Sequence, residues 1–198
     1  MKKRRIVLAA TMLTVSMLMF GCGSGKIGES VASGSNAESN PLLDANFKNH
    51  YNEVTVGNTT VSFPCDFHEL EELGFSCESG SDALIGKETP STVVLTKDES
   101  SVKVRVANNK ATDVTVSDSK VVALLATREE SEKLALSFYG GITFESSEED
   151  VKKVLDLMES ENGEALYGIK MGDYSYLSVS FHNGKVNDIM IVNGENYF

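Results

Sequence analysis

The last third of the chain alternates between apolar and polar residues, which is typical of strands that bury one face of a sheet. Residues 165–171, 175–182 and 186–192 follow this period of two. The segments between them are Gly172-Asp173 and Asn183-Gly184, and Asn-Gly is a strong signal for a two-residue hairpin turn. The pattern therefore predicts a three-stranded antiparallel meander.

Two short amphipathic segments predict helices. Asp66 and Glu69 in the first segment have the spacing of a capping box, in which each side chain satisfies the backbone amide of the other residue. Ser146 and Glu149 have the same spacing in the second segment. Four apolar residues at three- and four-residue spacing follow there: Val151, Val154, Leu155 and Met158. We therefore expect the second helix to be the longer one and to run to Ser160.

An internal repeat relates the two halves of the folded region. Residues 61–73 align without a gap with residues 142–154, and four apolar positions coincide. In each half an extended run precedes this segment and a set of alternating runs follows it. The sequence therefore predicts an α+β fold of two tandem repeats, residues 41–127 and 128–198, packed as one compact unit. Each repeat is expected to hold a strand, a turn, a second strand, one short helix and a three-stranded antiparallel meander.

The first 25 residues have the composition of an export signal. Four basic residues, Lys2 to Arg5, precede an apolar run from Ile6 to Phe20. This run would span about 22 Å as a helix, against roughly 30 Å of hydrocarbon in a bilayer. We therefore predict that residues 1–21 are a cleaved signal peptide and not a permanent membrane span.

The end of this segment, Met19-Phe20-Gly21-Cys22, resembles the lipobox of bacterial lipoprotein signals. In that family the cysteine thiol receives diacylglycerol, and acyl chains such as palmitate hold the protein at the membrane. The resemblance implies a lipid-anchored protein on the extracytoplasmic face of a cell membrane, inner or outer. Residues 23–40 contain too few apolar residues to fold, so we expect residues 22–40 to be the lipidated cysteine and a flexible tether.

The net charge limits the class of partner. The chain holds 29 acidic and 18 basic residues, and four of the bases lie in the signal, so the mature part carries 14 minus 29, a net charge of −15. Such a surface repels nucleic acid and anionic lipid headgroups. We therefore expect no nucleic-acid partner, and we expect the lipid on Cys22 to supply the membrane attachment.

The other two cysteines, Cys65 and Cys77, are 12 positions apart. A helix followed by an extended return would bring the two sulfurs together, and a bridge would stabilise the fold by roughly 3 kcal/mol. Two free thiols are the alternative, and the sequence leaves both open.

The sequence carries no recognisable catalytic or metal-binding motif. His50, His68 and His182 lie in three different contexts without the spacing of metal ligands. No motif pairs a nucleophile with a base. We therefore expect no enzymatic activity, no cofactor and no metal.

The tyrosines and isoleucines of the last meander indicate a partner surface. Two-residue turns on both sides of the central strand would place five side chains on the sheet face away from the helix: Tyr167, Ile169, Tyr176, Ile189 and Ile191. Such a face suits protein recognition, and packing against the first repeat is the alternative. The same register turns Asp188 toward the apolar side, so we predict a β-bulge near Asn187-Asp188.

The second half also resembles the small helix-plus-sheet module of β-lactamase inhibitory protein and of the small lipoproteins of the outer-membrane assembly machine. The resemblance is carried by Gly141-Ile142-Thr143-Phe144, Ser147, Val151 and Tyr167, followed by the closing strands. The duplicated form resembles uncharacterised lipoproteins of Gram-positive bacteria. This likeness implies protein binding without chemistry.

Together these features predict a lipid-anchored extracytoplasmic protein-interaction module without catalytic activity. An inhibitor, an assembly factor or a sensor accessory would fit, with a protein partner that the sequence does not identify. The alternative is a small-ligand or metal-binding lipoprotein, with a pocket of converging polar groups between the two repeats.

Overall fold

A computed structural model describes residues 49–158 and 166–197, and strands predominate in it. Strands make up about 50% of these residues and helices about 18%. The strands are β1 (Glu53–Val56), β2 (Thr59–Ser62), β3 (Cys65–Asp66), β4 (Ser76–Cys77), β5 (Leu84–Ile85), β6 (Ser91–Lys97), β7 (Ser100–Ala107), β8 (Val114–Thr115), β9 (Lys120–Thr127), β10 (Leu136–Phe138), β11 (Asp156–Met158), β12 (Leu166–Gly172), β13 (Ser175–His182) and β14 (Lys185–Asn193). The helices are α2 (Phe67–Glu72), α3 (Arg128–Ser131) and α4 (Glu148–Lys152), with 3-10 turns η2 (Val116–Asp118), η3 (Glu132–Leu134) and η4 (Tyr139–Gly141). The predicted signal peptide, Cys22 and the tether lie outside the described residues.

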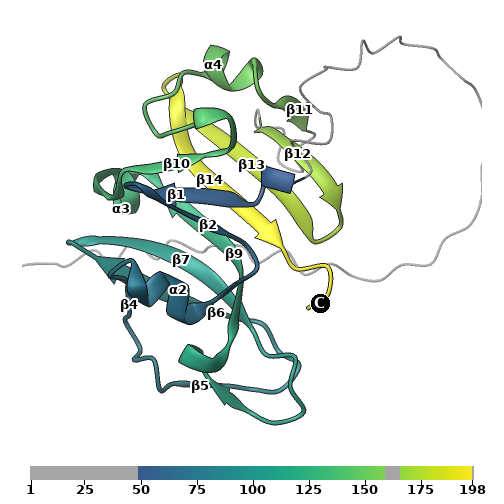
Figure 1. The fold of residues 1–198 in the computed structure, drawn as a ribbon. Helices are drawn as coiled ribbons and strands as arrows, with labels where there is room; N and C mark the ends of the chain where they lie inside the picture. The colour runs from purple at the N-terminus through teal and green to yellow at the C-terminus, as the bar shows by residue number, and fades with distance from the viewer. Residues whose placement is uncertain (1–48, 159–165, 198) are drawn as a thin grey trace, which may run out of the picture. The chain divides into compact units, whose positions relative to one another are not determined.

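One antiparallel sheet of nine strands runs through both halves of this region (Figure 1). Its strand order is β11-β12-β13-β14-β9-β7-β6-β4, and β3 pairs with β9 beside this path. The last strands of the two halves, β9 and β14, are neighbours, so that Leu124 pairs with Ile191 and Ala126 with Ile189. Backbone hydrogen bonds therefore join the two halves into one sheet.

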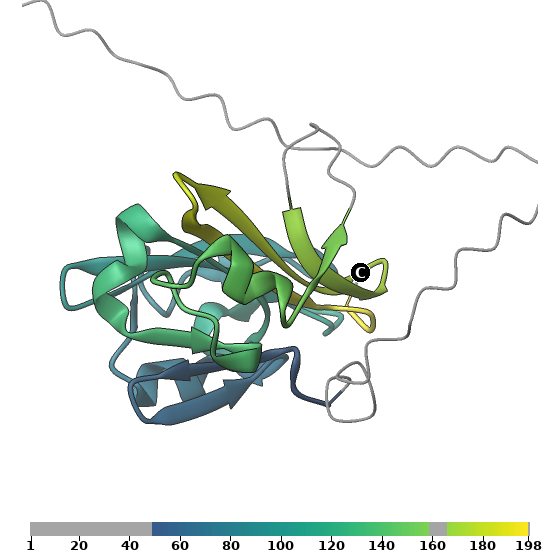
Figure 2. The same ribbon diagram turned by 90° about the horizontal axis from the view of Figure 1, so that it is seen from above.

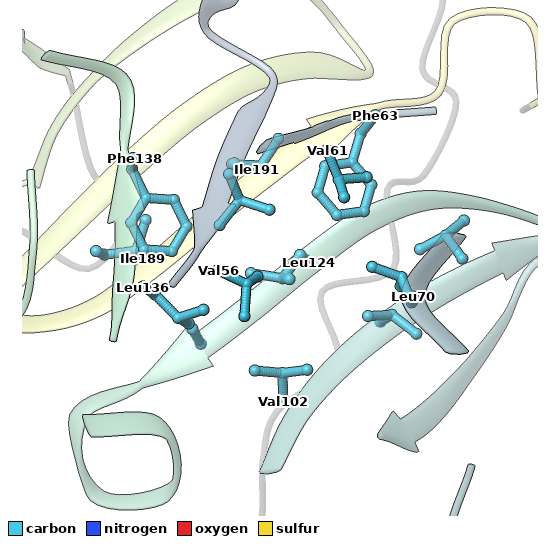
Figure 3. Packing of buried hydrophobic residues seen from close by; sticks show 14 of the residues in the cluster. Val56, Val61, Phe63, Leu70, Val102, Leu124, Leu136, Phe138, Ile189 and Ile191 are labelled. Atoms are coloured by element: carbon cyan, nitrogen blue, oxygen red, sulfur yellow. The ribbon is translucent and has the colours of Figure 1, made fainter. Parts of the chain in front are cut away.

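A second, three-stranded sheet packs against one face of the large sheet. Its order is β10-β1-β2, so β1 of the first half pairs with β10 of the second. Figures 1 and 2 show these strands on one side of β9 and β14. Val56 and Phe138 from the small sheet share one buried cluster with Leu124 and Ile189 from the large sheet (Figure 3). The core therefore lies between two sheets.

The first predicted helix is confirmed as α2. Asp66 is the residue at its amino-terminal cap, and the backbone N–H of Asp66 donates to Glu69 Oε1 at 3.0 Å, as in a capping box. Phe67 and Leu70 are buried, each with 1% of its surface exposed. The helix therefore covers part of the sheet with one turn of apolar side chains.

The second helix is much shorter than predicted. Ser147, and not Ser146, caps α4, and the helix ends at Lys152 instead of running to Ser160. Residues 156–158 form strand β11 along the edge of the sheet, paired with β12. An isolated helix of this length is marginal, whereas an open sheet edge offers a backbone partner to each residue in turn. Ser160 itself lies outside the described residues.

The predicted α+β class of two helix-plus-meander repeats is therefore wrong, because the protein is mostly β. The strands of the first meander, which the sequence predicts at residues 92–97, 102–108 and 120–127, agree within two residues with β6, β7 and β9. The helices are short: α2 has six residues and α4 has five. The buried cluster takes side chains from both sheets, and the short helices add only a few, such as Phe67 and Leu70 of α2 and Val151 of α4.

Candidate functional site

The predicted partner surface does not exist as one face. Four of its five residues are buried in the core: Tyr167 is 7% exposed, Ile169 9%, and both Ile189 and Ile191 0%. Tyr176 is half-buried and lies on the opposite face, because it pairs with Val192 while Leu177 pairs with Ile191. The predicted grouping is therefore wrong, because four of the five side chains lie in the core.

Two β-bulges explain the inverted faces. The register of β12 against β13 shifts between Lys170 and Gly172, which leaves Met171 as an extra residue. The register of β13 against β14 shifts between Ser180 and Phe181, which leaves Asn187 as an extra residue. Each bulge moves the pairing by one residue and exchanges the two faces beyond it.

The predicted bulge near Asn187-Asp188 is confirmed. It pairs Asp188 with Ser180 instead of a core residue, and Ser180 Oγ donates to Asp188 Oδ2 at 2.7 Å. The carboxylate is therefore kept out of the apolar core, where an ionised group would be costly. The same bulge turns Ile189 and Ile191 inward.

The face of the nine-stranded sheet that points away from the small sheet, here called the outer face, is the surface that remains. Strand pairing places these residues on it: Val94, Lys103, Arg105, Ala123, Leu125, Lys170, Tyr176, Ser178, Met190 and Val192. The small sheet and α2 lie on the other side (Figures 1 and 2). The outer face is therefore a second apolar surface of a sheet whose first face forms the core.

The centre of the outer face is apolar and partly exposed. Leu125 pairs with Met190 on one side and with Lys103 on the other, and Val94 pairs with Lys103. Val94, Leu125 and Met190 are all half-buried. The sequence signal for this surface is the continuous apolar run over residues 121–126. A strand with one solvent-exposed face would instead alternate between apolar and polar residues.

Tyr176 lies beside this apolar centre. Its hydroxyl donates to Met190 Sδ at 3.3 Å, so the ring lies along the sheet surface. Burial raises the pKa of Tyr176 above its usual value, and the positive charge of Arg105 partly opposes this effect. The phenol is therefore neutral at physiological pH and presents a half-buried aromatic surface.

Three basic side chains surround the apolar centre. Arg105 and Lys170 are exposed, and Lys103 is half-buried. Lys103 Nζ pairs with Glu130 Oε2 of α3 at 3.3 Å, and Lys170 Nζ pairs with Asp173 Oδ1 at 3.2 Å. The outer face therefore carries basic groups in a chain whose net charge is −11.

A cavity of about 260 Å³ lies between segments of the two halves. It is lined by His50, Glu53, Thr55, Ser137, Phe138, Tyr139, Gly140 and Gly141. His50 Nδ1 lies 2.8 Å from Glu53 Oε1. Residues of β1, β10 and η4, together with His50, thus line one pocket. Among the described residues no group of three or more His, Cys, Asp or Glu side chains is arranged to hold a metal.

Cys65 and Cys77 are free thiols on different strands. Cys65 of β3 pairs with Val121 of β9, and Cys77 of β4 pairs with Leu95 of β6. The path across the sheet from β3 to β4 passes through β9, β7 and β6, which is four strand spacings, or about 19 Å. A disulfide needs the two Cα atoms to lie within about 7 Å of each other. Burial raises the pKa of the Cys65 thiol to about 12. Of the two alternatives, the structure therefore supports free thiols.

The part of the chain that carries the predicted lipid site, Cys22, is not among the described residues. Within the described ranges, none of the helices is long and apolar enough to span a bilayer. A scan against protein-family models found no matching family, and searches of curated proteins and of solved structures found no similar protein or structure.

Proposed function

We propose that this chain is a lipid-anchored extracytoplasmic protein-interaction module without catalytic activity, and that it binds its protein partner through the outer face of the nine-stranded sheet. The observation that carries the proposal is the apolar centre of that face, where Val94, Leu125 and Met190 lie only partly buried beside Tyr176. Partly exposed apolar groups that form a contiguous patch are typical of interaction sites.

The composition of the outer face suits a protein partner. Tyr176 offers a large apolar ring with few rotatable bonds, so that little conformational entropy is lost when a partner covers it. Met190 is unbranched and polarizable, and such side chains adapt to the shape of a partner. Both side chains lie on paired strands of a broad sheet, which holds them in place before binding.

The charges indicate the chemistry of the partner. Lys103, Arg105 and Lys170 favour a surface with acidic groups around an apolar centre. The rest of this chain is acidic, so it repels copies of itself at long range while these three residues attract an acidic partner locally.

The anchor defines where the module acts. The lipobox-like ending at Cys22 implies attachment to the extracytoplasmic face of the cell membrane, and residues 23–40 give the domain a root-mean-square reach of about 25 Å from it. A module that is held there and binds a protein would act as an inhibitor, an assembly factor or a sensor accessory.

Site-specific photocrosslinking in whole cells tests the interaction surface. A crosslinking amino acid at Ser178 of the outer face should capture a defined protein, while the same amino acid at the exposed Thr60 of β2 should not. Arg105→Glu should remove the captured band without lowering the melting temperature, because Arg105 is exposed. Equal capture from both positions, or capture that survives Arg105→Glu together with Tyr176→Ala, would refute the proposal.

Cell fractionation tests the anchor separately. Cys22→Ser should move the protein from the membrane fraction to the soluble fraction, because the lipid is proposed to be its attachment. Retention of the variant in the membrane fraction would contradict the lipid anchor but would leave the outer face as a candidate surface.

A second candidate function rests on the cavity between β1 and η4. A carboxylate, an imidazole, hydroxyl groups and the Tyr139 side chain line it, a combination that suits a small polar ligand. A thermal-shift screen of small polar compounds tests this function. A compound that raises the melting temperature of the protein but not that of Glu53→Gln would support it, and the absence of such a compound would count against it.

A further inference from the structure

Two large apolar side chains are exposed together at the turn between β12 and β13. Met171 is 39% exposed and Tyr174 is 44% exposed. Leu84 and Leu157, the other large apolar side chains exposed among the described residues, lie on β5 and β11. Met171 and Tyr174 therefore form a small apolar pair in one turn.

The backbone holds this pair in its exposed position. The bulge between Lys170 and Gly172 makes Met171 the extra residue of β12, and bulges commonly redirect a side chain. The backbone N–H of Tyr174 donates to Glu195 Oε1 at 3.3 Å, and the N–H of Gly194 donates to the carbonyl of Tyr174 at 2.8 Å. The segment after β14 therefore fixes the turn, and the exposure of the pair is a defined feature of the fold.

The turn lies next to the point where the rest of the chain joins the domain. Asn49 is the first described residue, and Tyr51, two positions later, is 5% exposed and hydrogen-bonded to Ser175 at the start of β13. Figures 1 and 2 show the β12–β13 turn and the end of β14 close together. The first described residues thus lie beside the start of β13, in the hairpin that carries Met171 and Tyr174.

We propose that Met171 and Tyr174 rest on the phospholipid bilayer and orient the domain with the outer face of its sheet accessible to a partner. This inference rests on the proposed lipid anchor at Cys22. Tyrosine favours the membrane–water interface, because its ring is apolar and its hydroxyl stays hydrated.

The contact depends on the anchor. Two side chains bury too little apolar area to hold a protein at a membrane, and the net acidic charge opposes approach to anionic headgroups. A lipid on Cys22 would change this balance, because attachment at the surface would give the domain a millimolar effective concentration there. The anchored protein should therefore show the contact, and the soluble Cys22→Ser variant should not.

Tryptophan fluorescence can test this contact, because the chain contains no tryptophan. Tyr174→Trp places a single reporter in the turn, and Thr60→Trp places the matched control on the exposed surface of β2. The full-length lipidated protein is reconstituted into vesicles of phosphatidylcholine and phosphatidylglycerol at physiological salt. Bromine on the lipid acyl chains quenches tryptophan that lies at the interface.

We expect the emission of the Tyr174→Trp protein to shift to shorter wavelength on vesicles and to be quenched several-fold more than that of the control. Met171→Trp should show the same blue shift and quenching as Tyr174→Trp. Agreement between the two variants excludes an effect of one substitution on its own surroundings. Vesicle flotation is measured first, so that the two proposals can fail separately. Protein that does not float would overturn the anchor, and with it this contact.

Protein that floats but shows equal quenching at the two positions would overturn the contact alone. A blue shift that depends on protein concentration and occurs without vesicles would mean that a second copy covers the turn, and it would also overturn the lipid contact.

Discussion

Replacing Ile189 by alanine tests the strand register that decides which residues form the outer face. Ile189 of β14 is 0% exposed and pairs with Ala126 on one side and Val179 on the other. The substitution removes three carbon atoms, which is worth about 2.5 kcal/mol of transfer free energy at about 0.8 kcal/mol each. The cavity that remains adds to this loss, so the free energy of unfolding should fall by about 3–4 kcal/mol.

Met190 supplies the matched control, because it is the next residue on the same strand and lies on the outer face. Met190→Ala also removes three heavy atoms, but the side chain is only partly buried, so the expected loss is smaller, about 1–1.5 kcal/mol. Urea unfolding followed by circular dichroism measures both variants. The free energy of unfolding falls by about 2 kcal/mol per molar urea for a domain of this size, so Ile189→Ala should lower the urea concentration at the unfolding midpoint by almost 2 M.

The opposite ranking would refute the register. If Met190→Ala cost about 3 kcal/mol and Ile189→Ala cost about 1, then the bulge at Asn187 would be absent and the outer face would be made of other residues. Equal small losses would show instead that β14 does not belong to the core.

Three further predictions concern other parts of the fold. Gly168→Ala should destabilise the protein by about 1–3 kcal/mol in thermal unfolding, because its Cβ would collide with a backbone carbonyl of the facing strand β13. The pKa of Asp150 is held at about 2, below its usual 3.8, mainly by the hydrogen bond from Ser147. The ionised carboxylate therefore stabilises the folded protein above roughly pH 4, and this contribution is lost as the pH falls toward 2. Ser147→Ala should raise the pKa of Asp150 in an NMR titration and cost about 1 kcal/mol through loss of the helix cap, and an unchanged pKa would contradict this assignment. A thiol reagent should label Cys77 faster than the buried Cys65 in the folded protein and label both at once in denaturant, whereas no labelling of unfolded, unreduced protein would mean a disulfide.

Features that depend on neighbouring residues could be predicted from the sequence. The turn at Asn183-Gly184 is confirmed, since His182 pairs with Lys185 across it. The cap at Asp66 is also confirmed, because the interaction involves only Asp66 and Glu69. The bulge near Asn187 followed from one local conflict, a charged Asp188 at a position that a regular strand would bury.

Features that depend on distant segments could not be predicted in the same way. The apolar spacing in residues 151–158 fits a helix, yet residues 156–158 join the sheet because β12 offers an edge there. No residue near Met171 shows that β12 is bulged, since the extra residue exists only relative to β13. The separation of Cys65 from Cys77 depends on the strands that lie between them.

The sequence by itself thus determined the strands of the two meanders, the turn at Asn183-Gly184 and the helix cap at Asp66, and it predicts the lipid site at Cys22. Tertiary structure decided which side of each strand is the core. The physical reason is the period of two along a strand, because a single extra residue exchanges the two faces, and the extra residue Met171 is defined only by the pairing of β12 with β13. Ile189 and Ile191 therefore lie in the core, and Leu125 and Met190 lie on the outer face with Tyr176.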